Sequence, residues 1–168
     1  RAVAYTDEDL YLGHGRALME PVTQARLIQA LAPVPTDKAM DVGCATGYSS
    51  AILASLCAKV IAVEPNTNFL AESQKNWARL GYGNIVAYNA SFSDGCEQDA
   101  PYDLILVNGS VAKIPPSLVD MLGKGGRMAV IVKTPTDKIG RAVLVTKDSN
   151  GIVGQRVMFD AAVPYLPG

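Results

Sequence analysis

The fold of this chain is decided by one segment, Ala39-Met40-Asp41-Val42-Gly43-Cys44-Ala45-Thr46-Gly47-Tyr48. An apolar strand over residues 39–42 leads into a Gly-x-x-x-Gly turn, and a helix leaves the turn through residues 49–54. Glycines in such a turn allow positive φ angles and a close approach of the backbone to a ligand. The start of the helix adds free N–H groups and the positive end of its dipole. The segment therefore predicts a strand, a turn and a helix that together can hold a ligand.

A second strand, expected over residues 59–63, is followed by the acidic residue Glu64 and by Pro65. An acid at the end of the second strand of such a unit is placed to accept hydrogen bonds from both hydroxyls of a ribose. The two segments together predict a nucleoside site at the edge of a doubly wound sheet. The simpler alternative is a strand–turn–helix unit whose glycines serve packing alone.

The spacing of the glycines indicates which nucleoside is bound. A dinucleotide site carries G-x-G-x-x-G and rests a pyrophosphate on the helix N-terminus, whereas here Cys44 and Ala45 separate Gly43 from Thr46. Asp41 also ends the first strand, and a carboxylate there repels a pyrophosphate but suits a cation. S-adenosylmethionine (SAM) has a sulfonium, an ammonium and a ribose, and it has no phosphate. The pattern Asp-x-Gly-x-x-x-Gly followed by Glu64 therefore predicts a SAM site.

The length and composition of the chain argue against several other classes of protein. The length of 168 residues predicts a single domain over 1–168, and the net charge of -1 without a basic run argues against a nucleic-acid partner. Apolar runs such as residues 129–132 are too short to cross a bilayer, so no membrane partner is expected. The chain begins with Arg1 rather than Met, and we therefore expect an upstream segment to be missing.

The cysteines and the single histidine limit the chemistry further. Cys44, Cys57 and Cys96 are odd in number and form no C-x-x-C pair, which predicts a reduced, cytoplasmic setting. His14 is the only histidine, so a histidine-rich zinc site is excluded and no metal is expected. We interpret Cys44 as a small residue chosen for fit and not as a nucleophile.

The rest of the chain alternates between the helical and the strand pattern. Residues 1–19 lack periodicity, and residues 12–16 predict a glycine-rich loop. Helices are expected from Pro21 to Pro33, over 67–80 and over 117–122. Helix 67–80 is expected to place Leu70, Ser73, Trp77 and Leu80 on one face, with Trp77 as a packing residue. Further strands are expected over 85–88, 102–107, 127–133, 142–146 and 155–159, with a tight turn at 124–126 and a hairpin around Asn150-Gly151.

This order of elements predicts an α/β fold with three layers. We expect a doubly wound, mostly parallel sheet of the Rossmann-like, SAM-dependent methyltransferase kind, with antiparallel strands added at the C-terminus.

The chain resembles the protein-L-isoaspartate O-methyltransferase family, nearly without gaps from about residue 5 to residue 132. The resemblance rests on the glycine turn, on Glu64, and on the segments Pro101-Tyr102-Asp103, Ile114-Pro115 and Gly125-Gly126. It also rests on Leu12-Gly13-His14-Gly15-Arg16-Ala17-Leu18-Met19-Glu20-Pro21, where the family has Ile/Leu-Gly-x-Gly-Gln-Thr-Ile-Ser-Gln-Pro. It implies methyl transfer from SAM to a carboxylate of a peptide or protein, as in protein repair, with S-adenosylhomocysteine (SAH) as product. It also implies helical structure upstream of this chain.

The expected site combines the motifs with this resemblance. Cofactor contacts are expected from Asp41, Gly43, Cys44, Ala45, Thr46, Gly47, Tyr48, Glu64, Pro65, Ala90, Ser91 and Asn108. The methyl-transfer pocket is expected to be lined by His14, Arg16, Leu18, Met19 and Asn108. His14 and Arg16 are the side-chain donors left in the loop, and their alternative is to face solvent.

Two departures from the family pattern bear on activity. The family's Thr-Ile-Ser, whose hydroxyls line the methyl-transfer pocket, is replaced by Ala17-Leu18-Met19. The family's Gly-Asp-Gly, whose Asp meets the adenine amino group, is replaced by Asn89-Ala90-Ser91. We therefore expect low or absent isoaspartyl methylation and a weak adenine contact. A SAM-binding module with lost activity, or an enzyme with a different, small-molecule acceptor, stays open.

Two other enzyme classes fit less well. A short-chain nicotinamide oxidoreductase would need a further glycine where Ser49 stands, and a Tyr-x-x-x-Lys pair that this sequence lacks. A methyltransferase acting on nucleic-acid amines commonly places Asn-Pro-Pro-aromatic after the fourth strand. Asn108-Gly109-Ser110-Val111 does not match that pattern.

Overall fold

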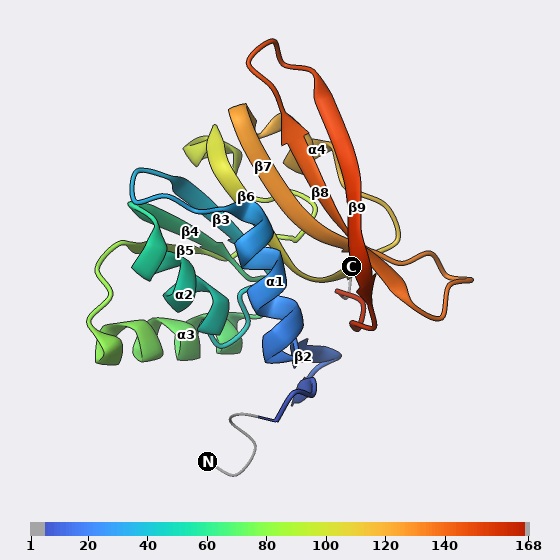
Figure 1. Ribbon diagram of the computed structural model, residues 1–168. Coiled ribbons are helices and arrows are strands. Elements are labelled where there is room, and N and C mark those ends of the chain that lie inside the picture. Colours follow the sequence, from blue (N-terminus) through green and yellow to red (C-terminus); the bar gives the residue numbers. More distant parts are fainter. Residues whose placement is uncertain (1–5, 167–168) are drawn as a thin grey trace.

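A sheet of seven strands forms the centre of the molecule, with strand order β5-β4-β3-β6-β7-β8-β9 (Figure 1). The computed structural model describes residues 6–166. The strands are β3 (Lys38–Val42), β4 (Lys59–Val63), β5 (Ile85–Tyr88), β6 (Tyr102–Val111), β7 (Leu122–Val132), β8 (Gly140–Lys147) and β9 (Val153–Ala161). Strands β5 to β7 in this order pair in parallel, and β8 and β9 add antiparallel pairs. This confirms the predicted fold class.

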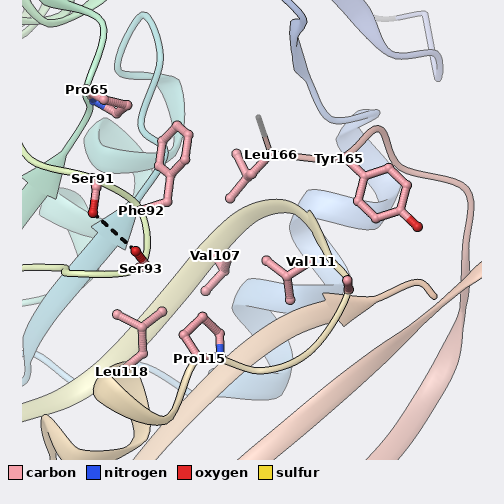
Figure 2. Close-up of a pocket in the computed structure, with 11 residues that line it drawn as sticks. Pro65, Ser91, Phe92, Ser93, Val107, Val111, Pro115, Leu118, Tyr165 and Leu166 are labelled. Atoms are coloured by element: carbon pink, nitrogen blue, oxygen red, sulfur yellow. Dashed lines mark hydrogen bonds between the residues drawn. The ribbon is translucent and has the colours of Figure 1, made fainter. Parts of the chain in front are cut away.

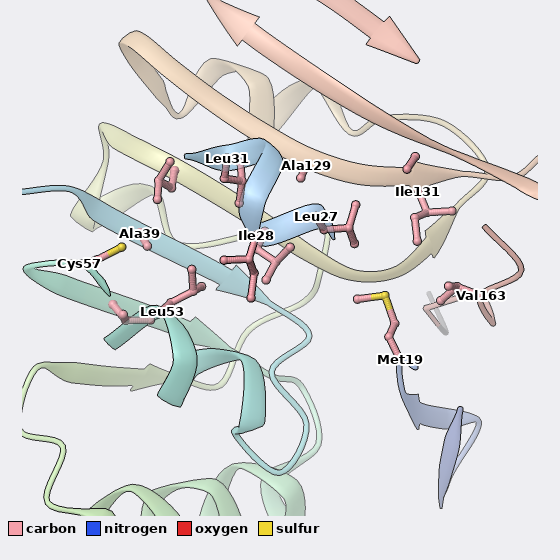
Figure 3. Close-up of a cluster of buried hydrophobic side chains, with 14 of the residues drawn as sticks. Met19, Leu27, Ile28, Leu31, Ala39, Leu53, Cys57, Ala129, Ile131 and Val163 are labelled. Carbon is pink, nitrogen blue, oxygen red and sulfur yellow. The ribbon is translucent and has the colours of Figure 1, made fainter. Parts of the chain in front are cut away.

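Helices cover both faces of the sheet. Helices α1 (Pro21–Leu31) and α2 (Tyr48–Leu56) bury Leu27, Leu31 and Leu53 against one face, as Figure 3 shows. Helix α3 (Thr67–Leu80) packs beside α2 through Trp77. The opposite face carries the short helix α4 (Pro116–Asp120), which directly precedes β7. Leu118 of α4 packs into a second apolar cluster. Burial of these side chains is the main favourable term in folding.

The helix boundaries follow from local chemistry. Pro21 occupies the first turn of α1, where its missing N–H costs nothing. Asn66 caps α3 because its side chain accepts hydrogen bonds from the backbone N–H groups of Asn68 and Phe69. Gly81 ends α3 in the left-handed conformation, with φ of 79°. Capping therefore places the start of α3 directly after Glu64.

The glycine-rich loop predicted over residues 12–16 is wrong in part, because the structure has a hairpin there. Strands β1 (Leu10–Gly13) and β2 (Arg16–Leu18) pair antiparallel and form a separate sheet of two strands. Gly13, His14 and Gly15 turn the chain between them, all with positive φ. Two strands this short carry too few alternating residues for the period of two to show in the sequence.

Three further expectations differ from the structure. Leu80, the last residue of α3, is 60% exposed, and the buried residues of the helix are Phe69, Ser73 and Trp77. Strand β6 continues beyond residue 107 to Val111. The glycine turn at 124–126 lies inside β7, as an irregularity in its pairing with β6 between Tyr102 and Leu104. A bulge keeps the strand hydrogen-bonded on both sides of the extra residues.

Candidate nucleoside site

The site lies where the order of the sheet reverses. Strands β3 and β6 are neighbours in the sheet, and Val42 pairs with Val107, so Gly43 after the end of β3 lies beside Asn108 of β6. Chain direction runs from β3 outward to β4 and β5 on one side, and from β6 to β7 on the other. Ligands of open α/β sheets bind outside the carboxyl ends of the strands at such a switch point.

The glycine turn is anchored to the neighbouring strand. The backbone N–H groups of Gly43 and Cys44 donate to the carbonyl oxygen of Val63, over 2.8 and 3.3 Å. Gly43 has φ of 79° and Gly47 has φ of 93°, so both require the left-handed conformation that glycine adopts freely. A Cβ added at Gly47 would lie 2.4 Å from Nε1 of Trp77, which itself donates to the Gly47 carbonyl oxygen. Gly47 therefore serves the packing of α3, and Gly43 faces the site.

Glu64 is the centre of the hydrogen bonds at the site. Its side chain is fully buried and accepts hydrogen bonds from the backbone N–H of Ala45 at 2.9 Å and of Asn66 at 3.1 Å. Nη1 of Arg16 donates to both carboxylate oxygens, at 2.9 and 2.7 Å. A buried carboxylate needs such partners, because desolvation of an isolated charge is costly. Both oxygens of Glu64 are therefore in use within the chain.

Arg16 reaches this position from β2. Its side chain is 4% exposed, and Nη2 donates to the carbonyl oxygen of Gly43 at 2.8 Å. The guanidinium lies over the ring of Phe92, 4.8 Å from the ring centroid. A Cβ added at Gly43 would come within 3.0 Å of Leu166 and 3.1 Å of Arg16. The space above Gly43 is therefore filled by side chains from three distant parts of the chain.

A second buried network lies beneath the turn. Asp41 is fully buried and accepts hydrogen bonds from Ser49, Ser50 and Asn108. Asn108 in turn accepts a hydrogen bond from Gln24 of α1, at 2.8 Å. Burial raises the pKa of Asp41, although its three hydrogen bonds oppose this shift and the nearby Glu64 charge adds to it. The network ties α1, β3, α2 and β6 together below the site.

An apolar pocket of about 380 Å³ opens beside these residues at the carboxyl edge of the sheet (Figure 2). Pro65, Ser91 and Phe92 line one side, and Val107 and Leu118 form its floor. Leu166 also lines this pocket, and it lies so close to Gly43 and Gly109 that an added Cβ would come within 3.0 and 2.6 Å of its side chain. The pocket has the apolar lining with a few polar groups that is typical of small-molecule sites.

The remaining predicted residues are distributed around this centre. The carbonyl oxygen of Thr46 accepts a hydrogen bond from Asn76, and Ala90 packs against the cluster that contains Leu118. Burial raises the pKa of the Cys44 thiol well above its usual range, which keeps it neutral. Tyr48 is 48% exposed and lies away from Glu64, at a surface pocket of about 240 Å³. Leu18 and Met19 line the same surface pocket.

His14 and Met19 lie in different parts of the structure, one on the surface and one in the core. His14 is exposed at the tip of the hairpin, and its ring packs edge-to-face with that of Phe69, with 5.9 Å between the ring centroids. Met19 is 5% exposed and packs in the core with Leu27, Ile131 and Val163 (Figure 3). The structure thus brings Arg16, Gly43, Ala45 and Glu64 together, and it sets the predicted methyl-pocket residues His14, Leu18 and Met19 apart from them.

Several residues of the site were not predicted from the sequence. Phe92 and Leu166 cover Arg16 and Gly43, and Asn89 donates to the carbonyl oxygens of Glu64 and Pro65. Ser49 and Ser50 could have been found, because hydroxyls in the first turn after a glycine loop lie near the end of the preceding strand. Phe92 and Leu166 carry no such signal in the sequence.

The fold and site define the class: this is a Rossmann-like domain of the SAM-dependent methyltransferase kind. A solved protein-L-isoaspartate O-methyltransferase superposes with a TM-score of 0.87 at 20% identity, over 99% of this chain and 55% of that one. A Plasmodium falciparum structure described as a protein-L-isoaspartate O-methyltransferase, in complex with SAH, has a TM-score of 0.78 at 24% identity. The superposition covers 97% of this chain and 81% of the Plasmodium falciparum chain.

The sequence comparisons give the family. The family model of protein-L-isoaspartate(D-aspartate) O-methyltransferase matches residues 1–167, and the chain belongs to that family. A protein-L-isoaspartate O-methyltransferase of Aeropyrum pernix is 36% identical over 99% of this chain and 64% of its own length. One of Koribacter versatilis is 36% identical over 79% of this chain and 60% of its own length. This chain therefore spans less than two thirds of both relatives.

Within residues 6–166, no helix is long and apolar enough to cross a membrane.

Proposed function

We propose that this chain binds SAM and SAH and transfers the methyl group to a carboxylate of a peptide or protein, in the manner of isoaspartyl repair. The observation that carries the proposal is Glu64, a buried acid at the end of β4 beside the positive-φ Gly43. Family membership over residues 1–167 supports the same function. The relative of Plasmodium falciparum whose structure contains SAH shares this fold.

The residues present fit a nucleoside. Glu64 offers the two acceptor oxygens that ribose hydroxyls need, Gly43 allows close approach, and the neighbouring pocket of about 380 Å³ is apolar enough for a base. Asp41 lies below the turn and adds a negative charge when it is ionised. Arg16, Phe92 and Leu166 now lie close to Gly43, and the Arg16 side chain also lies on Glu64, so these side chains must shift for a ligand to enter.

SAM would supply an electrophilic methyl group on its sulfonium. In the proposed reaction a bond forms between the acceptor carboxylate oxygen and this methyl carbon, and the carbon–sulfur bond breaks with its electron pair on sulfur. A carboxylate is already a nucleophile at neutral pH, so the chain needs no general base. Its residues act through positioning and through exclusion of water.

The proposal has two direct tests. Calorimetric titration with SAH should show binding, and methyl-labelled SAM should label an isoaspartyl peptide but not its aspartyl twin. An analogue of SAH that lacks both ribose hydroxyls should bind more weakly, because Glu64 would lose its partners. The proposal is wrong if neither the wild-type chain nor an Arg16→Gln variant binds SAH.

A second candidate is a SAM-binding protein with altered or lost isoaspartyl activity. The observation that favours it is the segment Ala17-Leu18-Met19, which offers no hydroxyl and whose Met19 lies in the core. SAH binding without methylation of the isoaspartyl peptide supports this candidate, and labelling of another carboxylate or of a small molecule would define a different acceptor.

The proposed compartment is the reducing cytoplasm. Cys44, Cys57 and Cys96 are all buried as free thiols, which suits a chain kept reduced.

A further inference from the structure

Arg16 and a bound ribose would compete for the same atoms. Nη1 of Arg16 donates to both oxygens of Glu64, and the remaining contacts of that carboxylate are the N–H groups of Ala45 and Asn66. Each carboxylate oxygen already accepts one backbone N–H, from Ala45 or from Asn66, and one hydrogen bond from Arg16. Ribose hydroxyls would therefore need the acceptor positions that the guanidinium now uses.

We propose that Arg16 is an intramolecular competitor of the nucleoside: it closes the site when no ligand is bound and must leave Glu64 for a ligand to enter. This inference rests on the proposed function, and it adds a device that controls affinity. It makes the apparent affinity depend on the fraction of molecules in which Arg16 has left.

The hairpin that carries Arg16 lies outside the main sheet. Strands β1 and β2 form an isolated pair outside the main sheet, and such two-stranded hairpins are marginally stable on their own. The turn residues Gly13, His14 and Gly15 are exposed. Its closest ties to the site are the contacts of Arg16 itself with Glu64, Gly43 and Phe92. Met19 anchors the end of β2 in the core and His14 contacts Phe69, so the movement that ligand entry requires is that of the Arg16 side chain, which can leave Glu64 without disturbing β3 or β4.

The exchange is chemically balanced. When Arg16 leaves, Glu64 keeps the hydrogen bonds from Ala45 and Asn66 and gains those of the ribose hydroxyls. Arg16 regains water around a guanidinium that was 4% exposed. Without a ligand, however, departure of Arg16 leaves a buried charge without its counter-ion, which is strongly unfavourable. The closed state is therefore favoured in the free protein, and ligand binding shifts the population toward the open one.

The test is Arg16→Gln, measured for SAH affinity by calorimetry and for melting temperature without ligand. A glutamine is too short to make the paired contact with Glu64, so the free protein should melt at a lower temperature. SAH affinity should rise, by about tenfold if the closed form makes up about 90% of the free protein. Arg16→Lys keeps the charge but loses the paired geometry, and its affinity should lie between the two.

Arg127→Gln is the matched control. Arg127 also forms an ion pair, with Asp37 at 3.1 Å, and it donates to the carbonyl oxygens of Leu31 and Ala32. It lies at the opposite end of the sheet from Glu64, since β3 begins beside Asp37 and ends beside Gly43. Its loss should lower the melting temperature and leave SAH affinity unchanged.

The outcomes separate the two proposals. Opposite changes in stability and affinity in Arg16→Gln support the competitor, including the case where only the variant binds SAH. Binding by the wild type with equal or weaker binding by Arg16→Gln and Arg16→Lys overturns the competitor and leaves the proposed function intact. Absence of binding in all variants overturns both.

Discussion

Glu64 has two kinds of partner, and its substitution should reveal both. In the free chain, Glu64→Ala leaves Arg16 buried without its counter-ion, so we expect the free energy of unfolding to fall by about 3–5 kcal/mol. Urea denaturation measures this loss. In the double variant Arg16→Gln/Glu64→Ala the loss should be smaller than the sum of the losses in Arg16→Gln and Glu64→Ala, because the two side chains form one interaction. Additive losses would show that the ion pair contributes nothing.

The same substitution tests the ligand. Glu64→Ala should weaken SAH binding by roughly 1.5–3 kcal/mol, the usual worth of hydrogen bonds to a charged group. The measured value combines this loss with the gain from releasing Arg16, so the proper reference is Arg16→Gln. Calorimetry on the double variant Arg16→Gln/Glu64→Ala against Arg16→Gln therefore isolates the ribose contact. Equal affinities of these two variants would place the ribose elsewhere.

Asp41 should give stability a distinct pH dependence. Burial holds its pKa above the usual range in the folded state, so the folded chain binds this proton more tightly than the unfolded chain does. The free energy of unfolding is therefore at its full value below the unfolded pKa of Asp41. It falls as the pH rises from there through the folded pKa. The stability of the wild type relative to Asp41→Asn should fall across this window and then level off, as measured by urea denaturation at a series of pH values. A constant difference would show that the pKa of Asp41 is the same in both states.

At the scale of elements, the first turn of α3 fixes the position of the acid. Asn66 caps the helix and also donates its backbone N–H to Glu64. Asn66→Ala should lower the free energy of unfolding by about 1 kcal/mol, the typical loss for an N-cap, and Asn66→Asp should lower it less. Thermal denaturation of the three proteins measures the difference. Equal losses in the alanine and aspartate variants would rule out the capping role.

Strand β2 carries the departure from the family's hydroxyl-bearing loop. Ala17→Thr with Met19→Ser should raise methylation of an isoaspartyl peptide, since one well-placed donor at a reacting centre is typically worth about 10²–10³ in rate. The structure adds a cost, because Met19 lies in the core and its truncation should destabilise the chain by about 2–5 kcal/mol.

The matched control for this pair is Met19→Ala, which opens the same cavity without a hydroxyl. Activity should be compared per folded molecule, at a temperature below the melting point of each variant. An equal rise in Met19→Ala would assign the effect to space in the pocket, and no rise in the double variant would favour the SAM-binding candidate.

Elements with a strong periodic signal could be predicted, and long-range contacts could not. Apolar runs in the sequence predict β3, β4 and β5. The glycines at 43 and 47 predict the turn after β3, and Asn66 as a cap predicts the start of α3. The position of Glu64 at the end of a strand predicts a hydrogen-bond acceptor. Its ion pair with Arg16 could not be predicted, because Arg16 is 48 positions away in the sequence and meets Glu64 only in the folded chain. The hairpin around His14 was missed because its strands are shorter than the window in which alternation can be recognised.

At the scale of the whole molecule, ligand binding should stabilise the fold. A ligand that binds only the folded state at about 100 times its Kd adds about 2.7 kcal/mol. For a domain of this size, about 2–4 °C per kcal/mol converts this to a rise of about 5–10 °C in Tm. Scanning calorimetry with SAH measures the rise, and homocysteine, which lacks the adenosine, should leave the Tm unchanged. A rise with homocysteine as well would show that the adenosyl group is not what the chain recognises.

The convergence of Arg16, Phe92 and Leu166 on Gly43 has a consequence for biosynthesis. A ribosome delivers the N-terminal part of a chain first, at about 5–20 residues per second. The hairpin and Glu64 precede Leu166 in the sequence and therefore emerge before it. A nascent chain can form the parallel strands before Leu166 covers Gly43 and Gly109. The site is completed only once Leu166 has been synthesised, so a chain shortened before Leu166 would leave both glycines less covered.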